Sequence, residues 1–268
     1  MSVSQRNLLP EALKLIRPIF VLKQVALALA VMLLSVAWLR LPDSSVLWLS
    51  VTVLLGLAIV VLAGAGESSL LLGLAGRPRT RKRLAAGTLL LAVAFLLWHF
   101  SGSLIEHLSA NDSLRAGYLN SRFGRHARYL FTYEHITLWL GWLWSLLQTF
   151  LGGLIVALCV APIPALKPTQ AILRTLRSFA YWIAVLLAFL VAPYITDKLE
   201  MWVPGHGLSV ELASLFFRML AILLVDTLIV SFLLAVLAVC VRRANEPYLE
   251  AIPSGTPLES QPRTAENP

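Results

Sequence analysis

Two ionisable side chains stand inside apolar stretches of the sequence and are the first candidates for chemistry. Asp226 lies within LLVDTLI (residues 223–229), and His99 lies within LWHF (residues 97–100). A charge near the centre of a bilayer costs about 2.5 to 3.5 kcal/mol on insertion scales, so it persists only with a partner or a function. Both residues lie about 8 to 10 Å from the expected outer ends of their helices, at about 1.5 Å per residue. We therefore consider a His99–Asp226 hydrogen bond or ion pair. The alternative is that backbone carbonyls, hydroxyl groups or water satisfy each residue separately.

Glu67 and Gln148 are two further polar side chains in apolar surroundings. Glu67 follows the small residues AGAG (63–66), which permit close helix packing, as Gly152 and Gly153 do further along the chain. We expect Glu67 to pair with a neighbouring Arg at the membrane interface; the functional alternative is a charge that lines a vestibule. Gln148 is expected to hydrogen-bond across helices.

Four arginines occur together in the segment between the third and fourth apolar stretches. They are Arg115, Arg122, Arg125 and Arg128. In helical projection they lie opposite an apolar arc, and guanidinium groups on one face of an interfacial helix can bind lipid phosphates bidentately. Lipid phosphate is therefore one predicted ligand, and a solvated polar face is the alternative.

Histidine and glutamate residues in the same region could in principle hold zinc. They are Glu106, His107, Glu134 and His135. Their spacing contains no His-Glu-x-x-His motif, and the chain has no Gly-x-Ser-x-Gly, Walker A or dinucleotide-binding pattern. We therefore predict no catalytic residue, no metal site and no cofactor. The residues carry no signature that names a family.

Composition identifies the environment that must position these residues. Of 268 residues, 58% are hydrophobic and 13% are charged, and the mean hydropathy is +0.79. A water-soluble domain could not cover so much apolar surface, which excludes a disordered chain, a disulfide-rich secreted module and an ordinary cytosolic enzyme. The net charge of +8 does not indicate nucleic-acid binding in such a chain. It indicates membrane orientation and attraction to anionic lipids.

Six apolar stretches are long enough to cross a bilayer, which takes roughly 20 residues. The sequence thus predicts an all-α fold, a polytopic bundle of six transmembrane helices. The second stretch can continue to Leu74. The first is expected to be a retained anchor, because no small-x-small cleavage site follows it. The stretches are Ile19–Leu41, Val46–Gly66, Leu84–Leu104, Ile136–Ala161, Phe179–Ile195 and Met219–Val241.

The distribution of basic residues predicts the orientation. If the N-terminus is cytoplasmic, most of the 22 Lys and Arg residues lie on the inner side, including the run RPRTRKR at 77–83. We therefore expect both termini to be cytoplasmic and the chain to be a multi-pass protein of the cytoplasmic (plasma) membrane.

Three regions follow from these patterns. Residues 1–18 are expected to form a cytoplasmic amphipathic lead-in helix, and residues 169–177 a second one. Residues 19–243 form the transmembrane domain, with an external loop at 105–135 that carries a surface helix. Residues 244–268 are rich in Pro, Glu, Ser and Thr and are expected to be a disordered cytoplasmic tail.

The function expected from sequence is general. The leading interpretation is a structural or accessory membrane subunit of a complex, whose partners are the lipid bilayer, anionic lipids and other membrane subunits, with no nucleic acid. One alternative is a transporter or permease component with a polar path through Asp226 and His99. Another is a metal-dependent or lipid-acting enzyme with an external His/Glu site.

Overall fold

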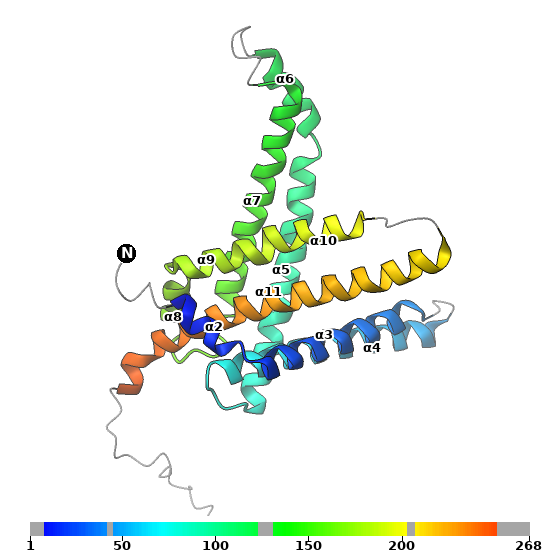
Figure 1. Ribbon diagram of the computed structural model, residues 1–268. Helices are drawn as coiled ribbons and strands as arrows, with labels where there is room; N and C mark the ends of the chain where they lie inside the picture. Colours follow the sequence, from blue (N-terminus) through cyan, green and yellow to red (C-terminus); the bar gives the residue numbers. More distant parts are fainter. Residues whose placement is uncertain (1–7, 42–44, 123–130, 203–206, 251–268) are drawn as a thin grey trace, which may run out of the picture.

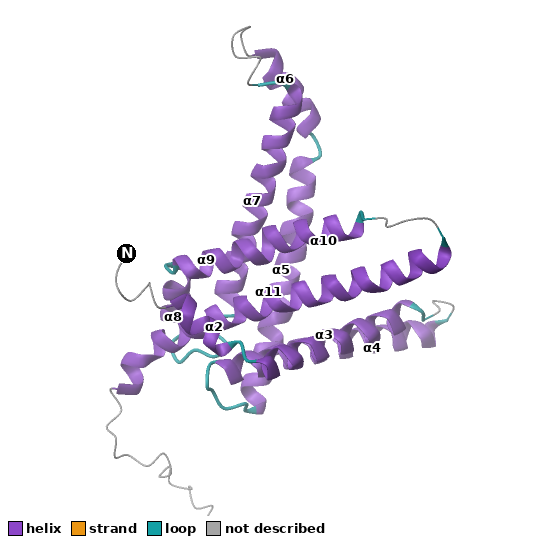
Figure 2. Cartoon of the chain, viewed as in Figure 1, coloured by secondary structure: helices purple, strands orange, loops and turns teal. Residues whose placement is uncertain are grey.

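The computed structural model describes residues 8–41, 45–122, 131–202 and 207–250, and every regular element in these ranges is helical (Figures 1 and 2). Six helical segments are long and apolar enough to cross a membrane. This confirms the all-α prediction and the continuation of the second stretch to Leu74. The elements are α2 (Leu8–Leu15), α3 (Pro18–Leu39), α4 (Val46–Leu74), α5 (Arg81–Ser109), α6 (Asp112–Arg122), α7 (Tyr133–Cys159), α8 (Pro168–Leu176), α9 (Phe179–Leu186), a π-helical turn η1 (Leu187–Val191), α10 (Ala192–Glu200) and α11 (Leu208–Glu250).

The long helices run in two directions. In Figure 1, α3, α4, α10 and α11 run roughly parallel, while α5 and α7 lie side by side and cross them at a steep angle. The far end of this pair, capped by α6, projects away from the other helices. We call α5, α6 and α7 the α5–α7 hairpin.

The core surrounds the C-terminal half of α11. Every residue from Leu233 to Val241 is buried, so this part of the helix is apolar and covered on all sides. Helices α2, α3, α8 and α9 all pack against α11. By contrast, no residue in the most apolar window of α4 is buried, although this helix packs against α3 and α5.

Gly76 ends α4 and turns the chain back towards it. Its φ is +68°, a left-handed conformation that favours glycine. Arg77 N–H donates to the Leu72 carbonyl at 2.8 Å and Gly76 N–H donates to the Gly73 carbonyl at 3.1 Å, which together form a Schellman cap. The cap directs the basic run that follows to the side of α4.

Two adjacent glycines hold α7 against its neighbours. A Cβ at Gly152 would lie 2.9 Å from Trp98 of α5 and 3.0 Å from Phe189 of η1, while one at Gly153 would lie 2.7 Å from Trp182 of α9. The buried Tyr181 hydroxyl donates to the Gly153 carbonyl at 2.5 Å. The predicted use of small residues for close packing is confirmed here, where the hairpin meets the rest of the fold.

The fifth apolar segment is interrupted by the π-helical turn η1. Pro193 follows it on α10 and has no N–H to donate to the preceding turn, and its ring excludes the carbonyl four residues earlier. A π turn accommodates one extra residue at such a point. Sequence reasoning treated this segment as one regular helix.

The two ends of the described chain lie together. Leu8 and Ala12 of α2 are buried in the core, α2 packs on α11, and Arg243 pairs with Glu11 at 2.7 Å. Helix α11 continues to Glu250, past the expected boundary at residue 243, because Ala244 and Asn245 are themselves buried. Residues 251–268 of the expected tail lie outside the described part of the chain.

Candidate functional site

Gly66 brings α3 against α4 directly beside Glu67. A Cβ at Gly66 would lie 2.6 Å from Leu27 Cδ1, so a larger residue would displace Leu27. Because the helices approach this closely, Gln24 on α3 reaches across to α4. Its Nε2 donates a hydrogen bond to Glu67 Oε1 at 2.5 Å.

This Gln24–Glu67 pair keeps two unused acceptors. Gln24 is only 3% exposed. Gln24 Oε1 and Glu67 Oε2 are both inaccessible and accept no hydrogen bond from the described residues. Glu67 also forms no ion pair there, so the Arg pairing expected from sequence is not found. The neutral amide of Gln24 stands where an arginine was expected. No positive charge in the described structure therefore compensates the Glu67 carboxylate when it is ionised.

Asp226 of α11 lines the same pocket as Gln24 and Glu67. The pocket has a volume of about 230 Å³, and its remaining lining is Thr227 and apolar side chains. We call it the acid pocket. Asp226 is half-buried and has no hydrogen bond or ion pair with any described residue. The lining includes no Lys, Arg or His.

The two carboxyl groups lie at different depths. Arg242 of α11 donates a hydrogen bond to the Leu74 carbonyl of α4, so these two positions are roughly level. At about 1.5 Å per residue, Glu67 is roughly 10 Å from Leu74 and Asp226 roughly 24 Å from Arg242. Asp226 therefore lies roughly 14 Å further along the helices than Glu67. The acid pocket thus joins two acidic positions within the spanning segments.

His99 and Gln148 do not belong to the acid pocket. His99 is exposed on α5, its ring contacts Phe100, and no hydrogen bond joins it to Asp226. The proposed His99–Asp226 pair is therefore absent from the described structure, because Asp226 faces α3 and α4. Gln148 faces Gly102 of α5, where a Cβ would lie 3.9 Å from its Nε2. It makes no hydrogen bond among the described residues.

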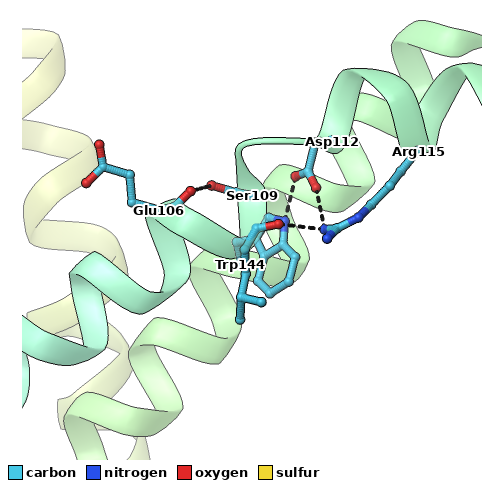
Figure 3. Close-up of polar contacts among 6 residues, drawn as sticks. Glu106, Ser109, Asp112, Arg115 and Trp144 are labelled. Carbon is cyan, nitrogen blue, oxygen red and sulfur yellow. Dashed lines mark hydrogen bonds and ion pairs between the residues drawn. The ribbon is translucent and has the colours of Figure 1, made fainter.

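At the tip of the α5–α7 hairpin, the first of the four arginines, Arg115, forms hydrogen bonds (Figure 3). Arg115 Nη1 donates to Asp112 Oδ1 at 3.0 Å and to the Leu108 carbonyl at 2.7 Å. Trp144 Nε1 donates to the other Asp112 oxygen at 2.5 Å. Arg122 lies over the Tyr118 ring. Two of these arginines thus have partners within α5 and α6. Arg125 and Arg128 lie outside the described residues.

The histidines and glutamates that were expected to share an external site do not converge. Among the described residues no three His, Cys, Asp or Glu side chains form a group that could hold a metal. Glu106, His107, Glu134 and His135 are all exposed. His135 N–H donates to the Thr132 hydroxyl as part of the α7 N-cap, and in Figure 3 the Glu106 carboxylate points away from Asp112. Their positions on α5 and α7 give no support to an enzyme site.

Gln24 is the site residue that sequence reasoning missed. It stands in the first apolar stretch, as IFVLKQVALAL (residues 19–29). The signal that could have found it is the one used for Asp226, a polar side chain inside a spanning helix. Its neutrality and its position near the start of that stretch made it resemble an interfacial residue.

Comparisons with protein-family models, with curated proteins and with solved structures find no match to this chain.

Proposed function

We propose that this chain is a transport protein of the cytoplasmic membrane, or the membrane component of one, in which protons or small monovalent cations bind in the acid pocket. The observation that carries the proposal is the placement of Glu67 and Asp226 in one intramembrane pocket without a basic partner. Ionisable groups within spanning helices commonly mark proton or ion paths in transporters.

The chemistry follows from charge and desolvation. An isolated carboxylate inside a membrane is expensive, and a bound proton or cation removes that cost. Gln24 Oε1 and Glu67 Oε2 are buried oxygen atoms that accept nothing from the described protein, so both are suited to a donor or a cation. Because Asp226 lies deeper than Glu67, the two groups offer successive binding positions along one route.

The direct test replaces Asp226 with its neutral isostere. We expect purified wild-type protein in sealed vesicles to carry protons or a monovalent cation down an imposed gradient, and Asp226→Asn to lower that flux about tenfold or more. The matched control is Asp197→Asn, since Asp197 is exposed on α10 and lies outside the acid pocket. Proton-sensitive and potassium-sensitive dyes distinguish the two cargoes. Equal flux in wild type, Asp226→Asn and protein-free vesicles would refute the proposal.

The orientation is part of the same proposal. The positive-inside bias supports cytoplasmic termini, and the contact between α2 and the end of α11 supports placing both on one side. We expect a cysteine at Pro78 to resist, and one at Asn120 to accept, a membrane-impermeant thiol reagent in intact cells. Native Cys159 and Cys240 are buried and should not interfere. Asn120 is the decisive position, because the hairpin that carries it crosses the other helices steeply.

The alternative that keeps support is a structural or accessory subunit of a membrane complex. The projecting hairpin exposes large apolar side chains such as Phe100, Trp139 and Trp142, which need lipid or another protein around them. Cross-linking of the α5–α7 hairpin to neighbouring proteins in native membranes distinguishes the accessory role from the transport role. A discrete heavier product without any ion flux would favour the accessory role.

A further inference from the structure

A second pocket, of opposite charge, lies where α3 begins and α4 ends. Its volume is about 310 Å³, and four basic side chains line it: Arg17, Lys23, Arg79 and Arg242. They come from the α2–α3 junction, α3, the α4–α5 connection and α11. No acidic side chain lines it, and none of the four forms an ion pair with a described residue. We call it the basic pocket.

Two of the three guanidinium groups in the pocket are held in place by helix carbonyls. Arg79 Nε donates to the Ser69 carbonyl at 3.1 Å, and Arg242 donates to the Leu74 carbonyl. Arginine has five N–H donors, so each group keeps others for a ligand. Gly73 permits the Arg79 arrangement, because a Cβ there would lie 2.5 Å from Arg79 Nη2. The cations are therefore arranged by the fold and are not simply a charged rim.

Apolar side chains complete the pocket. Phe20 is buried in it, and Ile19 lines it while remaining 63% exposed. A free anion would gain nothing from this surface, whereas a phospholipid places acyl chains beside its phosphate. Basic pockets between helices at a membrane face are a recurrent way to hold anionic lipid head groups.

We propose that the basic pocket binds the phosphate head group of an anionic phospholipid at the membrane interface. Arg79 and Arg242 supply oriented guanidinium donors, and the exposed Arg17 and Lys23 supply further positive charge. Ile19 and Phe20 contact the upper acyl chains. This site is separate from the acid pocket and from the arginines of α6, and it does not depend on the proposed transport.

The test measures lipid retained by the full-length protein. The protein is incorporated into nanodiscs of equal phosphatidylglycerol and phosphatidylcholine, extracted in mild detergent and examined by native mass spectrometry. We expect wild type to retain phosphatidylglycerol preferentially. Lys23→Gln with Arg79→Gln should lower that preference about tenfold or more. The control, Arg81→Gln with Lys82→Gln, removes the same amount of charge from the start of α5, outside the pocket.

A second variant separates geometry from charge. Gly73→Ala keeps every charge but forces the Arg79 guanidinium to move, since only the end of a flexible side chain obstructs the added methyl group. It should weaken phosphatidylglycerol retention several-fold with unchanged helix content. Equal loss in the Arg81/Lys82 control would overturn the proposal, because it would indicate general surface attraction. So would displacement of the lipid by inorganic phosphate alone, which would make the pocket a free-anion site.

Discussion

Gly153→Leu is expected to destabilise the folded protein by about 3 kcal/mol or more. Overpacking a tight contact costs about 1 to 3 kcal/mol, and leaving a buried hydroxyl unpaired costs about 1 to 3 kcal/mol again. Gly153→Leu would overpack the contact, because even an added Cβ at Gly153 would lie only 2.7 Å from Trp182 and 3.0 Å from Val185. Separation of α7 from α9 would also break the Tyr181 hydrogen bond to the Gly153 carbonyl.

Trp182 cannot move aside cheaply to admit the leucine. Its Nε1 donates to the Leu176 carbonyl at 2.8 Å, and its ring stacks on Phe150 with centroids 5.3 Å apart. Unfolding by SDS in mixed micelles, followed by tryptophan fluorescence, measures the effect. Gly141→Leu is the matched control, since Gly141 lies on the same helix with nothing within 4 Å of its added Cβ. Similar midpoints for the two variants would show that the α7–α9 contact contributes little.

Glu67→Gln is expected to abolish most ion flux while leaving the fold intact. The glutamine is isosteric and its Oε1 can still accept the hydrogen bond from Gln24 Nε2, so the free energy of unfolding should change by about 1 kcal/mol or less. The ionisable oxygen is lost, however, and with it the ability to bind and release a proton or cation. We expect flux in vesicles to fall about tenfold or more.

Comparison with Glu211→Gln checks this interpretation. Glu211 is exposed near the start of α11 and does not line the acid pocket, so the same chemical change there should leave flux as in wild type. If Glu67→Gln kept full flux while Asp226→Asn still lost the expected tenfold, the ion route would depend on Asp226 of α11 and not on Glu67. A large loss of stability in Glu67→Gln would instead assign Glu67 a structural role.

The membrane-spanning pattern could be predicted from sequence because it depends on local properties. About 20 consecutive apolar residues fix a spanning helix whatever its neighbours are. Four of the six expected stretches lie wholly within helical segments of the structure, and the other two, which end at Leu41 and Ala161, extend two residues past the ends of α3 and α7. The hydroxyl N-caps Thr80 and Thr132, which precede α5 and α7, are local signals of the same kind, although the expected stretches began three residues later than these helices, at Leu84 and Ile136. The interruption at η1 was not foreseen, because apolar composition does not distinguish an α turn from a π turn.

The partner of each polar group could not be predicted in the same way. Asp226 and His99 lie at similar expected depths, and depth alone suggested that they meet. Which faces of two helices meet depends on the packing of all the others. Here Gly66 lets α3 approach α4 closely, and Gln24 and Glu67 then line the same pocket as Asp226. His99 instead lies on a helix that packs against α4 and α7.

The sequence by itself thus determined that the chain is helical, where its six helices long and apolar enough to span a membrane lie, and that Asp226 and Glu67 need an explanation. Only the tertiary structure brought Gln24, Glu67 and Asp226 into one pocket and four cations into another. The physical reason is that burial in a bilayer depends on hydropathy along the chain, whereas contacts between helices depend on shape. Single glycines such as Gly66, Gly73 and Gly153 decide that shape at positions that hydropathy cannot distinguish.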